Sequence, residues 1–195
     1  MCGRYNFEWD PEGREGGRLY RLFTLKYPGS EIPQGEIFPG YLMPVLVDGS
    51  PKAELRLMTW GYSGMSQGSR RIINARAESV QEKNMFRADC GSRRCIVPTK
   101  GFYEWTPGPV KKKYLFSLPG SEMVYLAGIF NQKDEFTIIT TDANESVLPV
   151  HKRMPLVISV QDIKDWLSRS DLTEQFLSSK GPVLTKLEIT GGEDQ

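Results

Sequence analysis

The sequence predicts an α+β fold in which a strongly bent or barrel-like, mainly antiparallel β-sheet carries a few flanking helices. Short runs rich in β-branched and aromatic residues alternate with Gly- and Pro-containing turns along most of the chain. Such closely spaced strands pair as antiparallel neighbours rather than as βαβ units. Clear helical patterns are few, and the best two lie near the C-terminus.

The strand predictions follow this alternation along the chain. Val45–Val47 runs into Asp48-Gly49, a strong turn signal, and Glu54–Trp60 alternates beyond that turn. The later predicted strands are Arg94–Val97, Gly101–Trp105, Tyr114–Leu118, Val124–Phe130, Phe136–Thr140 and Leu156–Ser159.

Three segments have helical character: Gly17–Tyr27, Gln161–Leu167 and Asp171–Leu177. Ser159 and Ser170 precede the last two and are the expected N-caps. A chain of 195 residues fits one domain, at roughly 150 residues per domain. We therefore expect a single domain over residues 1–190, followed by a frayed polar tail at 191–195.

Composition excludes several classes of protein. No apolar run approaches the ~20 residues of a membrane span, and the start of the chain lacks the pattern of a signal peptide, so a soluble cytoplasmic protein is expected. The 25 Lys and Arg against 24 Asp and Glu give a net charge of +1, which by itself predicts no nucleic-acid partner. With 3 Cys and 1 His, neither a disulfide framework nor a metal site is expected, and no cofactor is predicted.

Cys2 is the first residue with distinctive chemistry. Removal of Met1 would leave it with a free α-amine beside a thiol, with reference pKa values of about 7.7–8.0 and 8.5. The amine can condense with an aldehyde to an imine, and the thiol can then close on the imine carbon to form a thiazolidine. From the residue alone, a small residue that opens the first strand is the simpler interpretation.

His151 and Glu104 are candidates for proton transfer. The histidine lies in a Pro-bounded loop, where it is either a general acid or base or a hydrogen-bonded surface residue. The glutamate stands among three aromatic residues in 101–105, which would raise its pKa. Strand alternation allows the opposite interpretation, a Glu104 on a solvated face.

Asn74, Arg76 and Glu78 occupy alternate positions, so an extended segment would point all three one way and Ala75 and Ala77 the other. A helix would make them an exposed polar face. Arginines are frequent between positions 70 and 94, and with Arg4, Arg76, Lys152 and Arg153 they would form one basic surface or a scattered solvated set. Side chains expected to stack on unpaired bases beside them are Trp60, Met85 and Phe86.

In combination, these residues resemble the SRAP family (SOS response-associated peptidase-like proteins). The matching blocks cover most of residues 2–170 in the family's order. They are Met-Cys-Gly-Arg at the start, Trp60-Gly61, 73–78 (Ile-Asn-Ala-Arg-Ala-Glu), 93–98 (Arg-Arg-Cys-Ile-Val-Pro), 101–105 (Gly-Phe-Tyr-Glu-Trp), Ala127-Gly128, 136–144, 151–155 (His-Lys-Arg-Met-Pro) and Trp166-Leu167.

The resemblance implies a sensor of abasic sites in single-stranded DNA, which acts in DNA repair and the SOS response. By this resemblance Cys2 is the nucleophile that forms a thiazolidine with the ring-opened sugar, and Asn74 positions it. Glu104 assists ring opening and proton transfer, and His151 is an acid and base. The DNA-binding residues implied in this way or by their type are Arg4, Pro39, Trp60, Arg76, Met85, Phe86 and Arg153. The imine intermediate also implies an abasic-site lyase side activity.

The chain departs from the family pattern in segments near the expected DNA channel. The usual Asn-Ile-Ala-Pro-Thr-Gln block stands here as 36–41 (Glu-Ile-Phe-Pro-Gly-Tyr), which keeps Pro39. After Trp60-Gly61, segment 62–66 replaces the usual Leu-x-Pro-x-Trp, and His151-Lys152 replaces the commoner His-Asp.

Two other functions compete with crosslinking. A thiol peptidase would use Cys2 to attack an acyl carbon, with His151 as base and Glu104 as its orienting partner, and in its modest form would remove only Met1. A non-catalytic binder of single strands would need only the arginines and the aromatic residues. We expect a monomer whose partner is single-stranded DNA with abasic sites, with no membrane association, and which lies on the nucleoid when bound to DNA.

Overall fold

The computed structural model describes residues 2–64 and 68–190. Its strands are β1 (Arg4–Phe7), β2 (Gly35–Ile37), β3 (Leu42–Val47), β4 (Glu54–Trp60), β5 (Asn74–Arg76), β6 (Arg94–Thr99), β7 (Gly101–Trp105), β8 (Lys113–Ser117), β9 (Val124–Phe130), β10 (Glu135–Asp142), β11 (Arg153–Pro155), β12 (Val157–Ile158) and β13 (Thr185–Ile189). Its helices are α1 (Arg14–Lys26), α2 (Asn84–Ser92), α3 (Ile163–Ser168) and α4 (Thr173–Leu177), with 3₁₀ turns η1 (Ala77–Ser79) and η2 (Ser170–Leu172).

The strands form two sheets. The eight-stranded sheet has the order β11-β10-β4-β3-β6-β9-β12, with β5 beside β10. Because β9 also pairs with β10, this sheet bends round into a ring without becoming a barrel. The second sheet has five strands in the order β13-β8-β7-β1-β2. Most pairs are antiparallel, as predicted, but β10 runs parallel to both β4 and β5.

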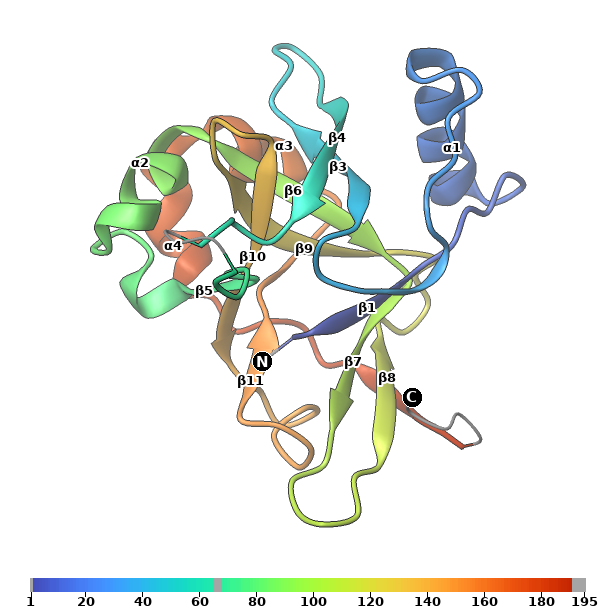
Figure 1. The fold of residues 1–195 in the computed structure, drawn as a ribbon, viewed down its shortest axis with the longest axis vertical. Coiled ribbons are helices and arrows are strands. Elements are labelled where there is room, and N and C mark those ends of the chain that lie inside the picture. Colours follow the sequence, from blue (N-terminus) through green and yellow to red (C-terminus); the bar gives the residue numbers. More distant parts are fainter. Residues whose placement is uncertain (1, 65–67, 191–195) are drawn as a thin grey trace.

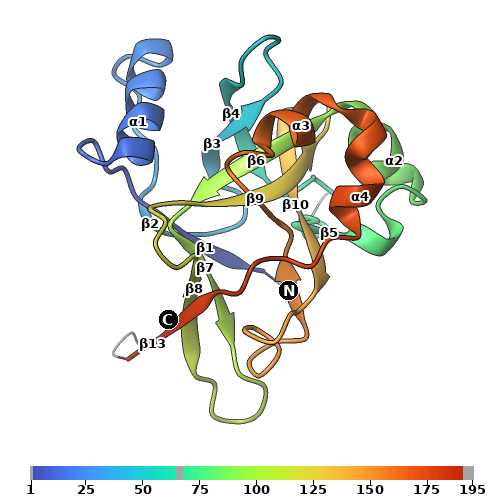
Figure 2. The same cartoon turned by 180° about the vertical axis from the view of Figure 1, so that it is seen from behind.

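The helices lie outside the strands in two separate places. Figures 1 and 2 show α1 at one end of the molecule and α2, α3 and α4 together on the other side. Helix α3 covers β6, where the indole of Trp166 donates a hydrogen bond to the carbonyl of Cys95 at 2.9 Å. This cover explains why every residue of β6 is buried.

Large aromatic side chains fill the space between the two sheets. Tyr5 of β1 packs on Trp60 of β4 with ring centroids 4.9 Å apart, and Phe102 of β7 stacks on Phe116 of β8 at 5.3 Å. All four are fully buried. Burial of each such side chain contributes about 1.5–3 kcal/mol, so this core fixes β1 and β7 against the ring. Strands β1 and β7 position part of the candidate functional site.

The N-terminus of α1 differs from its sequence prediction for a reason that lies far along the chain. The helix begins at Arg14, three residues before the expected Gly17. The Glu122 carboxylate accepts the backbone N–H groups of Arg14 at 3.1 Å and Glu15 at 3.0 Å. These donors have no partner within the helix, so the distant carboxylate stabilises an earlier start.

The prediction that Ser159 and Ser170 are the N-caps of the last two helices was wrong. The residues that flank α3 and α4 are Asp162 and Leu172, and neither makes a side-chain capping bond. The Ser159 hydroxyl instead accepts the N–H of Asp162 at 3.3 Å, one turn before α3.

Helix α2 was not predicted at all. Residues 191–195, the expected tail, lie outside the described residues, and no described helix is long and apolar enough to cross a membrane.

Candidate functional site

Cys2 lies two residues before β1, in the buried core between the sheets. In Figures 1 and 2 the start of β1 lies beside β11. The antiparallel pairing of β1 with β7 places Arg4 opposite Tyr103. Because Cys2 precedes Arg4 and Glu104 follows Tyr103, Cys2 lies close to Glu104. The Cys2 side chain is fully buried, and burial followed by the charge of Glu104 raises the pKa of its thiol far above the ordinary range. The thiol is therefore held in its neutral form.

Asn74 contacts the same residue from another strand. Its Nδ2 donates a hydrogen bond to the Cys2 carbonyl at 2.9 Å. Strand β5 pairs with β10, with Asn74 opposite Ile138, and this pairing holds the amide in place. The extended interpretation is confirmed for β5, since Ala75 is buried and Arg76 exposed. The Asn74 Oδ1 is buried and has no hydrogen-bond partner among the described residues.

Glu104 of β7 is the buried carboxyl of the site, with only 4% of its side chain exposed. The interpretation of Glu104 as a residue on a solvated face was wrong, because successive residues 101–104 are all buried and both faces of this part of β7 are therefore covered. Burial raises the pKa of Glu104, and the charge of protonated His151 acts in the opposite sense. A carboxyl in this setting keeps its proton at a higher pH than an exposed one and can serve as an acid.

His151 faces this carboxyl from the segment before β11. Its Nδ1 lies 4.0 Å from Glu104 Oε1. The same Nδ1 lies 3.0 Å from both the backbone N and the carbonyl O of Arg153. A neutral Nδ1 accepts the Arg153 N–H, and a protonated Nδ1 donates to the Arg153 carbonyl. The backbone of Arg153 therefore holds the ring in both protonation states.

A cavity of about 490 Å³ opens beside the two groups. Glu104 and His151 line it together with residues of the β7–β8 connection and of the segment before β11. Trp105 and Pro149 are among its apolar lining residues, and Lys111 and Lys152 supply positive charge. The cavity is thus suited to a ligand with both apolar and anionic parts.

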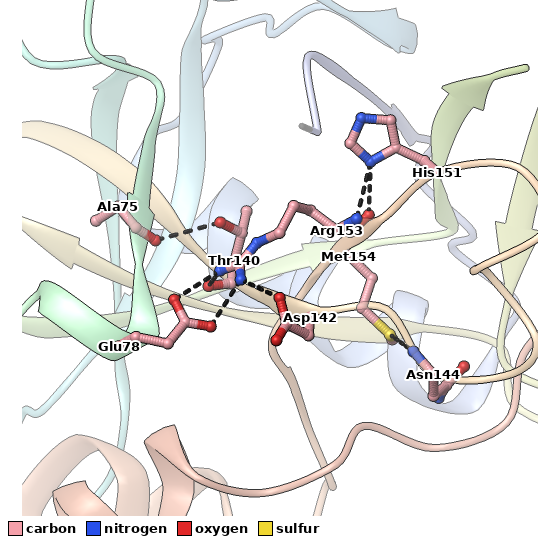
Figure 3. Close-up of polar contacts among 8 residues, drawn as sticks. All are labelled: Ala75, Glu78, Thr140, Asp142, Asn144, His151, Arg153 and Met154. Carbon is pink, nitrogen blue, oxygen red and sulfur yellow. Dashed lines mark hydrogen bonds and ion pairs between the residues drawn. The ribbon is translucent and has the colours of Figure 1, made fainter. Parts of the chain in front are cut away.

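Arg4 and Arg153, two candidate phosphate ligands, are already paired with carboxylates. Arg4 Nη1 donates to Glu36 Oε1 at 3.0 Å, and its guanidinium lies 3.7 Å above the Phe38 ring. Arg153 is enclosed more completely, between Glu78 and Asp142, as Figure 3 shows. Glu36, Glu78 and Asp142 had no predicted role, because a carboxylate next to an arginine in space leaves no pattern in the sequence.

Arg76 differs from these two arginines. It is exposed on β5, two residues after Asn74, and forms no ion pair with any residue that the structure describes. Three other arginines of the predicted basic surface, Arg71, Arg93 and Arg94, have partners within the fold. Arg94 is buried and donates to the carbonyls of Cys90 and Trp166, at 2.9 and 2.6 Å. Of the three candidate phosphate ligands, only Arg76 is unpaired within the described residues.

The residues predicted to stack on bases differ in exposure, because Trp60 and Phe86 are buried and Met85 is not. Trp60 is fully buried and Phe86 is 4% exposed, so the expectation that they stack on bases is wrong for this structure. Trp60 packs between Tyr5 and Phe136, and Phe86 faces Tyr62. Met85 is 40% exposed at the start of α2, and Pro39 is half-buried.

The three cysteines Cys2, Cys90 and Cys95 are free and buried. No group of three or more His, Cys, Asp and Glu side chains in 2–64 and 68–190 is placed to hold a metal ion.

Comparisons with known proteins identify the relatives of this chain. The family described as SOS response associated peptidase (SRAP) matches residues 1–189. Abasic site processing protein YoqW of Bacillus subtilis is 31% identical over 92% of this chain and 85% of its own length. Abasic site processing protein YedK of Escherichia coli is 26% identical over 73% of this chain and 68% of its own.

A solved structure supports the fold independently. A crystal structure of a Bordetella bronchiseptica protein superimposes with a TM-score of 0.77 at 19% identity, over 97% of this chain and 100% of that one. The family match over nearly the whole chain, together with the YoqW identity, shows the relationship. The chain therefore belongs to the SOS response associated peptidase (SRAP) family.

Proposed function

We propose that this protein senses abasic sites in single-stranded DNA and captures them as a covalent thiazolidine through Cys2, after removal of Met1. The observation that carries the proposal is the convergence of Cys2, Asn74, Glu104 and His151 from four segments of the chain, with Glu104 and His151 lining a cavity. Relatives with known roles are named abasic site processing proteins, which supports the same substrate class. The crosslink shields the lesion during repair.

The chemistry proceeds in two bond-forming steps. The α-amine of Cys2 attacks the C1′ aldehyde of the ring-opened deoxyribose, and loss of one water leaves an imine. The Cys2 sulfur then adds to the imine carbon, and the thiol proton passes to the nitrogen. A neutral thiol suits this order, because it closes the ring only after the amine has reacted.

Each polar neighbour has a definable part in these steps. Glu104, whose pKa burial raises, donates a proton to the ring oxygen as the sugar opens and regains one from the C1′ hydroxyl. It then donates that proton to the hydroxyl that leaves as water. His151, held through Nδ1, accepts and returns protons at Nε2. Asn74 fixes the Cys2 carbonyl and keeps the reacting end of the chain aimed at the cavity.

Binding before the reaction needs no base-specific contact. An abasic site lacks the base, so contacts to phosphate dominate recognition. Exposed Arg76 and the lysines of the cavity, Lys111 and Lys152, supply these contacts. An abasic-site lyase side activity follows from the same imine, which acidifies the neighbouring carbon and permits elimination of the 3′ phosphate.

Self-processing is a second candidate activity, favoured by the family description and by the position of Met1 directly before Cys2. His151 would act as base and Glu104, 4.0 Å away, as its partner. Repeated cleavage of other peptides is less compatible with the site, because a buried thiol with a raised pKa supplies little thiolate for acyl attack.

Intact mass spectrometry tests the proposal directly. The protein is measured before and after incubation with a single-stranded oligonucleotide that contains one abasic site, and a sample that retains Met1 is first treated with methionine aminopeptidase. We expect one stoichiometric adduct with the mass of the oligonucleotide minus one water. Absence of an adduct from the processed protein would contradict crosslinking, and binding without adduct would identify a non-catalytic binder.

A further inference from the structure

We propose that Glu78 is a specificity-determining residue, which competes with a DNA phosphate for Arg153 and so keeps non-covalent binding of intact strands weak. The inference rests on the proposed function, because it takes single-stranded DNA as the ligand. It concerns a carboxylate that the crosslinking chemistry does not use.

The guanidinium of Arg153 is fully occupied at its two terminal nitrogens. Nη1 donates to Glu78 Oε1 at 2.7 Å and to Asp142 Oδ1 at 2.6 Å, and Nη2 donates to Glu78 Oε2 at 2.9 Å and to the Thr140 carbonyl at 2.6 Å. Nε is buried and has no partner among the described residues. A phosphate can therefore reach Arg153 only by displacing one of these acceptors.

Glu78 occupies the position that a phosphate would take. Its carboxylate meets one N–H from each terminal nitrogen, as Figure 3 shows, and this parallel two-bond geometry is common to carboxylates and phosphates. Displacement of Asp142 would free an N–H of Nη1 alone. The Thr140 acceptor belongs to the backbone of β10 and is fixed by strand pairing.

Charge favours exchange of a carboxylate for a phosphate, and exposure permits it at Glu78 as well as at Asp142, whose side chain is 86% exposed. One guanidinium between two carboxylates offers a phosphate no net positive charge until a carboxylate gives way. The Glu78 side chain is 50% exposed, whereas that of Arg153 is 14% exposed. The carboxylate can thus turn into solvent while the arginine stays in position, beside the histidine that its backbone holds.

The consequence is discrimination between intact and abasic strands. Phosphate contacts are the same on both, so they cannot distinguish the two by themselves. A carboxylate that weakens these contacts shortens the time that an intact strand occupies the site, whereas a completed covalent bond retains the abasic strand regardless. Glu78 in this way acts against the wrong ligand.

The test compares Glu78→Gln with Asp142→Asn, a matched charge removal at the same guanidinium. Affinity is measured by fluorescence anisotropy with a labelled single-stranded oligonucleotide that has no abasic site. Glu78→Gln should bind it about threefold to fivefold more tightly, the range expected for loss of a half-exposed ion pair. Asp142→Asn should have a smaller effect. Added intact oligonucleotide should slow crosslinking more in Glu78→Gln than in the wild type.

Variants of Arg153 show whether Glu78→Gln changes the affinity for DNA through this arginine. In an Arg153→Ala background, Glu78→Gln should leave affinity unchanged, and a gain that persists there would overturn the inference, as would unchanged or weaker binding by Glu78→Gln alone. The Glu78→Ala/Arg153→Ala double variant should bind more weakly than the wild type, and equal affinity would show that Arg153 meets no phosphate. Failure of the proposed function would look different, as a wild-type protein that forms no adduct with the abasic oligonucleotide.

Discussion

Two glutamates on either side of the segment 151–153 are used in opposite ways. Glu104 is 4% exposed and faces His151 in the interior, and burial raises its pKa. Glu78 is 50% exposed and meets Arg153, whose hydrogen bonds lower its pKa. The difference follows from what each carboxyl faces. Burial in a dry core favours the neutral acid even beside a titratable imidazole, whereas a permanent cation at the surface favours the carboxylate.

A residue proposed to react and a residue proposed to bind DNA lie close together in the sequence. His151 and Arg153 are two positions apart, and the backbone of Arg153 contacts the His151 ring. The histidine side chain faces the group that can move a proton, and the arginine side chain faces groups that can only hold charge. Variants on the Glu104 side should therefore change the rate of crosslinking, and those on the Glu78 side should change the affinity for DNA.

The largest effect is expected at the nucleophile. Cys2→Ala should abolish the covalent adduct and leave binding of an intact oligonucleotide within about twofold, since the thiol makes no phosphate contact. Cys95→Ala removes another fully buried free thiol, from β6, and is the matched control that should still form the adduct. Adduct formation is measured by intact mass. The variant keeps an α-amine and can still form the hydrolysable imine, so only a stable adduct with Cys2→Ala would show that the sulfur is dispensable.

Glu104→Gln should slow crosslinking about 100-fold, the lower range for loss of a general acid, with affinity unchanged. The wild-type rate should fall as pH rises through the raised pKa of Glu104, because the proton to be donated is lost, and the variant should lack this dependence. Single-turnover adduct formation at several pH values measures both. A wild-type rate in Glu104→Gln would remove the acid from the mechanism and end the contrast with Glu78.

The elements that sequence predicted best are those specified by local pattern. The bounds of β4, β7 and β9 agree with their predictions residue for residue, since alternation and turn residues define them. The start of α1 depends on Glu122, whose distance along the chain hides the cap. Helix α2 was missed because its buried side chains, among them Phe86 and Cys90, are too few for a clear period.

The site was predictable in its residue types but not in its pairings. Asn74 and Glu104 were identified by alternation and by their neighbours, but the state of Glu104 depends on the packing of two sheets. Trp60 was expected at a DNA surface and is in the core, because an aromatic residue at a strand end gives no indication of its exposure. The carboxylate partners of the arginines come from distant segments, and only the fold brings them together.

A smaller effect is expected at Arg76, the candidate phosphate ligand that has no ion pair among the described residues. Arg76→Ala should weaken binding of intact and abasic strands alike and lower the slope of log K against log salt by about 0.7, the value for one phosphate contact on a single strand. Arg87→Ala removes another exposed arginine, from α2, and should change neither quantity. Anisotropy titrations over a salt series measure both. An unchanged slope in Arg76→Ala would place the phosphate contacts elsewhere.

The smallest effect is on stability, and it should have opposite signs at the two glutamates. Glu104 has a raised folded pKa, so its contribution to stability is fully present below the unfolded value of about 4.3 and is lost as pH rises through the folded pKa. Glu78 has a lowered folded pKa, so its contribution is present above the unfolded value and is lost as pH falls through the folded pKa. Relative to the wild type, Glu104→Gln should gain stability as pH rises, whereas Glu78→Gln should lose it. Urea unfolding of the three proteins between about pH 4 and 8 measures this. Parallel curves for the two variants would mean that both carboxyls experience the same environment, and the distinction between a reacting and a binding glutamate would fail.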